Sequence, residues 1–174
     1  MAMLAFVHAL AVFAAVAAAP VASDPLPVAT EGKMAAVVLL HASRVSPEDL
    51  KACCPGVADA LRLVFLTKPI DDPVDFAISP VVQMLIDRQK YPAEAADGAK
   101  RPVPRIEVRE VEDLFKLLPD LAGRVPPAFK PHLAVLVTVP CGTLPGSGQV
   151  EFALKLGYHR QVEPFSFAFA LPAK

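Results

Sequence analysis

Three cysteines are the side chains of this sequence best suited to chemistry. Cys53 and Cys54 are adjacent and Cys141 lies far along the chain, and cysteine sulfur is a ligand for soft metals such as zinc and copper. Together with His41 they form a candidate set of three sulfur ligands and one nitrogen ligand. The spacing opposes a metal site, because the chain has no C-x-x-C motif and adjacent side chains on a helix point about 100° apart.

A disulfide explains the same cysteines more simply. In an exported protein Cys141 can pair with Cys53 or Cys54 and leave one thiol over, while buried free cysteines are equally ordinary. We therefore predict no metal and no cofactor, and we take the three cysteines as candidate disulfide partners.

Cys141 also stands at the end of an apolar run and is followed by Gly142, which raises the hypothesis of a thiol nucleophile assisted by histidine. No histidine of the chain stands in a local catalytic signature, and no helix begins after Cys141 to lower the thiol pKa. The glycine-rich segment at residues 142–148 lacks Gly-Lys-Ser/Thr and leads into a strand, so it predicts a hairpin connection and no phosphate site. These observations favour a protein without enzymatic activity.

Two charged clusters lie in the middle of the chain. Asp71, Asp72 and Asp75 form a small acidic cluster, but Asp72 precedes a proline and has a simpler function as a helix N-cap. Lys100 and Arg101 lie in a proline-rich segment predicted to be an exposed loop, which makes them a candidate processing site. The 17 basic and 18 acidic residues of the 174-residue chain leave a net charge of -1, so no nucleic-acid partner is expected.

The N-terminal segment is the strongest single signal in the sequence. Residues 1–19 are apolar apart from His8 and carry no Asp, Glu, Lys or Arg, and small residues follow at 21–23. This pattern predicts a signal peptide over residues 1–23 and a secreted or extracytoplasmic protein. The alternative is a retained anchor, because a helix over residues 1–19 would be roughly 28 Å long and close to the thickness of a bilayer core.

The remaining chain divides into a tether and one domain. Residues 24–34 contain two prolines and a glycine, which indicates a tether, and residues 35–174 are long enough for one domain. The apolar run at residues 35–42 is typical of a strand buried on both faces, and residues 61–67 predict a second strand. Between them, Ser46 and the residues after it form an N-cap and first helical turn.

Proline also marks two further predicted helices. Cap-and-proline pairs at residues 72–73 and 79–80 predict a kinked helix over residues 73–91. After a loop over residues 92–105, an alternating strand is expected at 106–111 and a third helix at 112–123, with a break at Pro119.

Three alternating segments in the last third predict strands that form an antiparallel meander. Their apolar faces form one predicted core wall, made by Leu133, Val135, Val137, Val139, Val150, Phe152, Leu154, Leu156, Phe165, Phe167, Phe169 and Leu171. The last strand, with Phe165, Phe167 and Phe169, is also a candidate interaction edge, because another element can approach closely on its other face, which carries the small residues Ser166, Ala168 and Ala170. A helix packed on that face is the simpler explanation.

The order of these elements predicts a single α/β domain, or an α+β one, with a mixed sheet, flanking helices and a C-terminal meander. For function we expect an exported, non-enzymatic domain that acts through a protein partner. One alternative is a single-pass accessory subunit of a membrane complex, held by residues 1–19. The other is a small protein that depends on its thiols or on a metal.

Overall fold

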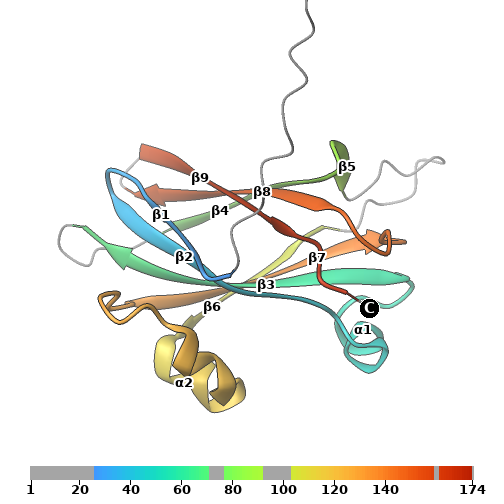
Figure 1. Cartoon of the computed structure of the whole chain (residues 1–174), viewed down its shortest axis with the longest axis horizontal. Helices are drawn as coiled ribbons and strands as arrows, with labels where there is room; N and C mark the ends of the chain where they lie inside the picture. The colour runs from blue at the N-terminus through green and yellow to red at the C-terminus, as the bar shows by residue number, and fades with distance from the viewer. Residues whose placement is uncertain (1–25, 71–76, 92–102, 159–160, 174) are drawn as a thin grey trace, which may run out of the picture.

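The computed structural model describes residues 26–70, 77–91, 103–158 and 161–173 of the chain. The described residues are mostly β-strand, and the helices are short (Figure 1). The strands are β1 (Val28–Glu31), β2 (Ala35–Arg44), β3 (Asp59–Pro69), β4 (Ala77–Ile86), β5 (Gln89–Tyr91), β6 (Arg105–Glu110), β7 (Leu133–Gly142), β8 (Gln149–Tyr158) and β9 (Gln161–Ala170). The helices are α1 (Pro47–Cys53), α2 (Val111–Leu117) and the 3-10 helix η1 (Pro119–Arg124).

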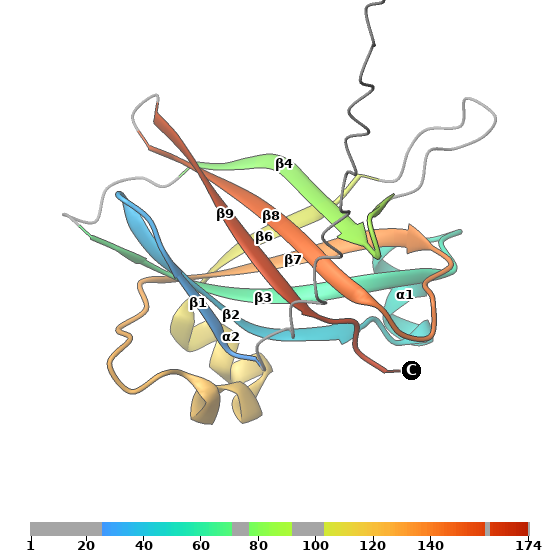
Figure 2. The ribbon, with the colours of Figure 1, turned by 45° about the horizontal axis from the view of Figure 1, so that its top comes forward.

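The strands form two antiparallel sheets packed face to face (Figure 2). Sheet A has the order β1-β2-β3-β7-β6 and sheet B the order β5-β4-β8-β9, and every strand pair is antiparallel. The predicted α/β or α+β fold with a mixed sheet is therefore wrong. An apolar run such as residues 35–42 is equally consistent with a parallel strand under helices and with a central strand of a sandwich.

The helix predicted over residues 73–91 is the largest error at the level of elements. Residues 77–91 instead form the β4–β5 hairpin. Its turn consists of Asp87 and Arg88, whose positive φ angles of 47° and 69° are those of a two-residue hairpin turn. The buried side chains Met84 and Ile86 are two residues apart, which is the period of a strand.

The helix prediction was wrong at Pro80 because a serine followed by proline occurs at helix starts and also in strands at positions that need no amide donor. The β4–β8 register shifts between Ser79 and Val82, so Pro80 lies in a bulge. The partner strand β5 pairs only with residues 84–86 of β4, so β5 requires no amide donor from position 80. Proline is tolerated at such positions in a sheet.

The main core lies between the two sheets, and the predicted core residues of the last third are found in it. Eleven of the twelve residues of the predicted core wall are buried, and Leu133 is half-buried. Phe65 of β3 contacts Phe152 and Phe167 of sheet B, with ring centroids 5.4 and 5.1 Å apart. The predicted meander is wrong in one respect, because β7 belongs to sheet A and faces β8 and β9 across the core.

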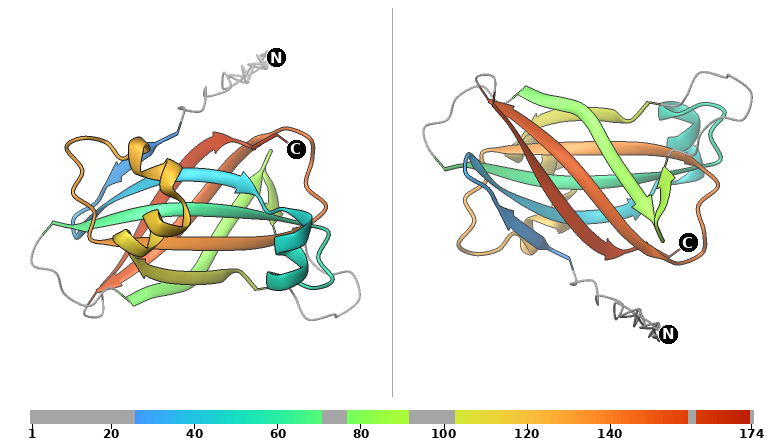
Figure 3. Two further views of the ribbon diagram at one scale, coloured as in Figure 1. Left: turned by 90° about the horizontal axis from the view of Figure 1, so that it is seen from below. Right: turned by 90° about the horizontal axis from the view of Figure 1, so that it is seen from above.

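The helices cover the outer face of sheet A alone within the described residues (Figure 3). Leu114 of α2 and Leu121 of η1 pack on Leu40, Val64 and other apolar residues of that face. The helix predicted at 112–123 is confirmed, with the expected break at Pro119. The helix predicted from Pro47 is also confirmed as α1, which lies at one end of the sandwich.

One side of the sandwich is closed by the segment predicted to be a tether. β1 lies within residues 24–34, pairs with β2 and lies beside β9. At the β1–β2 turn, the amides of Lys33 and Met34 donate to the two carboxylate oxygens of Glu163 at 2.6 and 3.0 Å. These bonds connect the edge of sheet A to the edge of sheet B.

Candidate functional site

The outer face of sheet B is the one large sheet surface that no other described element covers (Figure 3). Because side chains alternate along a strand, the residues between the buried ones point outward. In β8 these include Glu151 and Ala153, and in β9 they include Ser166 and Ala168. The helix expected over this face is not found among the described residues.

The strand register arranges these outward residues in two rows across sheet B. One row runs through Lys90, Leu85, Glu151 and Ala168, and the next through Gln83, Ala153 and Ser166. Between the rows lies an open hollow of about 640 Å³. Its short lining side chains, Ala153, Ser166 and Ala168, lie on β8 and the edge strand β9, and longer ones line it from β4 and β5.

The hollow combines an apolar floor with charges of opposite sign. Leu85, Ala153 and Ala168 supply this apolar surface, whereas the rings of Phe152 and Phe167 beneath it belong to the core. The ammonium of Lys90 and the carboxylate of Glu151 flank Leu85 within one row. Such a surface can bind an apolar group and orient it through charged neighbours.

The three phenylalanines predicted as an interaction edge lie in β9, at the edge of sheet B. Phe165, Phe167 and Phe169 are buried at 1%, 3% and 1% exposure. Their side chains belong to the core, so the outward surface of β9 is made by Ser166, Ala168 and Ala170, as the sequence predicted.

Leu85 and Lys90 were not predicted to form part of this surface. Both residues fell within the predicted helix over 73–91. The sequence has no alternation that would identify them, because Met84, Leu85 and Ile86 are all apolar.

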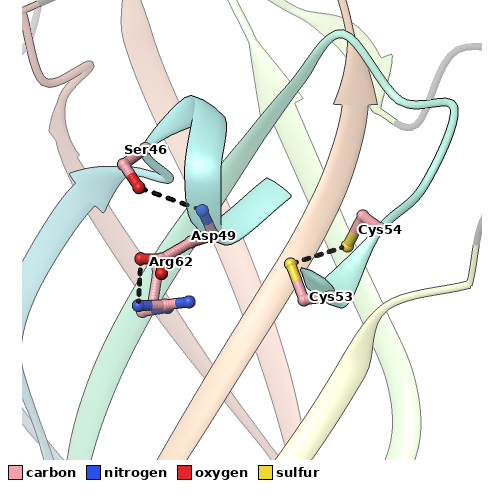
Figure 4. Close-up of polar contacts among 5 residues, drawn as sticks. All are labelled: Ser46, Asp49, Cys53, Cys54 and Arg62. Atoms are coloured by element: carbon pink, nitrogen blue, oxygen red, sulfur yellow. Dashed lines mark hydrogen bonds and ion pairs between the residues drawn. The ribbon is translucent and has the colours of Figure 1, made fainter. Parts of the chain in front are cut away.

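The second candidate site is the pair Cys53 and Cys54 at the end of α1 (Figure 4). Their sulfurs are 3.2 Å apart and share a hydrogen bond. Adjacent side chains on a helix would point away from each other, but these two do not both lie on a helix. α1 ends at Cys53, and Cys54 has the non-helical angles φ -142° and ψ 64°. The two thiols therefore converge.

Cys141 has a different environment from the pair. It is 2% exposed, donates a hydrogen bond to the Val139 carbonyl at 3.0 Å, and is a free thiol. Burial is the main cause that raises the pKa of its thiol to about 12. A thiol so placed is protonated at neutral pH and makes a poor nucleophile. The described residues contain no disulfide, and a Cys141 bridge stays a prediction.

His41, the histidine considered with the three cysteines, lies on β2 at the irregularity in the β2–β3 register. Burial, with a smaller effect of the charge on Arg124, lowers the pKa of His41 and favours its neutral form. Across the part of the chain that the structure describes, no three His, Cys, Asp or Glu side chains are grouped to hold a metal ion.

Other sequence predictions fall outside the described residues. These are the segment 1–23, the acidic residues Asp71, Asp72 and Asp75, and the dibasic pair Lys100 and Arg101. Among residues 26–173, with their gaps, no helix is both long and apolar enough to span a membrane.

The fold defines the class of this protein as an antiparallel β-sandwich with helices on one sheet and an open, hollowed face on the other. Comparisons of the chain with protein-family models, with curated proteins and with solved structures find no match.

Proposed function

We propose that this chain is an exported, non-enzymatic domain that binds a partner protein through the hollow on sheet B. The observation that carries this proposal is an apolar-floored hollow on a sheet face that no other described element covers. Sheet faces with apolar side chains are normally covered, by the protein's own helices or by a partner.

The proposed occupant is the apolar face of an amphipathic helix of the partner. On sheet A, α2 and η1 cover the outer face through leucine side chains. On sheet B, Ala153 and Ala168 are small enough for a helix to approach closely. Lys90 and Glu151 would pair with an acidic and a basic residue beside the apolar stripe, which fixes the direction of the helix.

The export part of the proposal is supported by the composition of residues 1–23. The alternative is an accessory subunit anchored by residues 1–19, with the same binding face. Intact mass of the native protein distinguishes them, because a cleaved chain starts after the leader and an anchored chain retains it.

The binding face is tested with a photo-crosslinking amino acid at position 168 in the native host. Position 170 is the matched control, because Ala170 lies on the same strand and points to the same side but does not line the hollow. The crosslinked partner is then purified, and its affinity is measured for Ala168→Arg and Ala170→Arg.

We expect position 168 to capture one protein, and Ala168→Arg to weaken its binding at least tenfold while Ala170→Arg leaves binding unchanged. Equal crosslinking at both positions would refute the proposal. A crosslink to a second copy of the chain, or to the chain's own N-terminal segment, would also refute it.

A further inference from the structure

The end of α1 holds two thiols in a partly open position. Ser46 accepts a hydrogen bond from the Asp49 amide at 3.1 Å and starts the helix, and Arg62 of β3 contacts the Asp49 carboxylate at 3.4 Å (Figure 4). The amide of Cys54 donates to the Leu50 carbonyl at 2.8 Å and ends it. The position of the cysteines is thus fixed by both ends of the helix.

The surroundings of the pair give access from solvent. Cys53 and Cys54 are both half-buried, against a small apolar cluster that includes Leu50. A cavity of about 350 Å³ lies beside Cys54, between α1 and the segment at residues 55–58. A small molecule can therefore approach Cys54 without opening the main core.

The geometry points to a redox function of this pair: we propose that Cys53 and Cys54 form a reversible disulfide with each other by exchange with a small-molecule disulfide. Their sulfurs need to close from 3.2 Å to about 2.05 Å. The described residues offer no third ligand for a metal, so the chemistry of a dithiol alone remains.

The bond would be labile because the two residues are adjacent. Consecutive Cα atoms are about 3.8 Å apart, whereas disulfides usually join Cα atoms about 4.4 to 6.8 Å apart. Deviation from this range stores strain and makes the bond easier to reduce. A vicinal disulfide here is therefore a switch that follows the redox state of the surroundings, in contrast to a structural crosslink.

The exchange proceeds in two balanced steps. One cysteine thiolate attacks the small disulfide, forms a mixed disulfide and releases one small thiolate. The second cysteine thiolate attacks the cysteine sulfur of the mixed disulfide and releases the other. Two electrons pass from the two cysteine sulfurs to the small disulfide, and the two cysteine protons go to the two released thiols.

To test this proposal, the whole protein is equilibrated in mixtures of reduced and oxidised glutathione. The exchange is then quenched with acid, and the remaining thiols are alkylated. Trypsin places Cys53 and Cys54 together in the peptide 52–62 and Cys141 in the peptide 125–155. Intact peptide masses therefore separate a bond within the pair from a bond to Cys141. Cys53→Ser and Cys54→Ser test the pair, and Cys141→Ser is the matched control.

We expect an excess of oxidised glutathione to yield a 52–62 peptide lighter by two hydrogen atoms and resistant to alkylation. An excess of reduced glutathione should reverse this change. Cys141→Ser should retain the response, and either variant of the pair should lose it while circular dichroism stays unchanged.

Three outcomes would overturn the inference. The first is a 52–62 peptide that is alkylated twice at every ratio or carries two separate glutathiones. The second is a bond between the peptides 52–62 and 125–155. The third is a bond within 52–62 that an excess of reduced glutathione does not break, because it would lack the proposed lability.

Discussion

Glu163 is expected to stabilise the sandwich by joining β9 to the β1–β2 turn. Its carboxylate accepts the amides of Lys33 and Met34 at 2.6 and 3.0 Å. A hydrogen bond to a charged group contributes about 1.5 to 3 kcal/mol, so the two bonds would contribute about 3 to 6 kcal/mol if they were buried. Because the site is partly exposed, we expect Glu163→Ala to lower the free energy of unfolding by less, about 2 to 3 kcal/mol.

Gly32 provides an independent way to break the same contact. A Cβ atom at this position would lie 2.5 Å from the Glu163 carboxylate, which is closer than real Cβ contacts allow. Because the carboxylate ends a flexible side chain, Gly32→Ala should displace it and lose the same two hydrogen bonds. The double variant Gly32→Ala/Glu163→Ala should then be little less stable than Glu163→Ala alone.

Urea unfolding followed by far-UV circular dichroism measures these costs, since the chain has no tryptophan for fluorescence. The reasoning would be refuted if the costs of Gly32→Ala and Glu163→Ala simply add. It would also be refuted if Glu163→Ala changes the free energy of unfolding by less than about 0.5 kcal/mol, the size of an ordinary surface substitution.

Three further predictions concern the core, α1 and the thiol pair. Phe65→Ala should cost about 3 to 5 kcal/mol of unfolding free energy, because Phe65 packs on both Phe152 and Phe167; a cost below about 1 kcal/mol in urea unfolding would contradict this packing. Ser46→Ala should cost about 1 kcal/mol through loss of the N-cap of α1, whereas an unchanged urea midpoint would show that the cap contributes nothing. Burial, followed by the hydrogen bond with Cys53, raises the pKa of Cys54 to about 11, despite the opposing charges of Arg105 and Arg62. Because the raised pKa keeps the thiol protonated, the rate of iodoacetamide labelling of Cys54 should rise about tenfold per pH unit from neutral pH to about pH 10. The rate is measured by mass spectrometry, and a plateau below about pH 9 would exclude the raised pKa.

Local sequence patterns predicted correctly those helices and strands whose type does not depend on the elements they pack against. The N-cap at Ser46 started α1, Pro119 ended α2, and alternation identified the buried faces of β7, β8 and β9. These features depend on residues within a few positions of one another, so the sequence contains them directly.

Local sequence patterns could not predict which strand belongs to which sheet. β7 and β8 follow one another in sequence, yet they lie in opposite sheets. The short loop between them is held by distant groups: the Leu144 amide donates to Asp59, and Arg44 donates to the Pro145 carbonyl. Contacts of this kind link residues far apart in the chain, and no local period reports them.

In the candidate sites, too, some features follow from the local sequence and others from tertiary contacts. The sequence by itself determined which residues of β8 and β9 point outward, because side chains alternate along a strand. Tertiary structure decided that this face stays uncovered by other described elements and that β4 and β5 complete the hollow. It also brought Cys53 and Cys54 together, because α1 ends between them, and the end of a short helix depends on what it packs against.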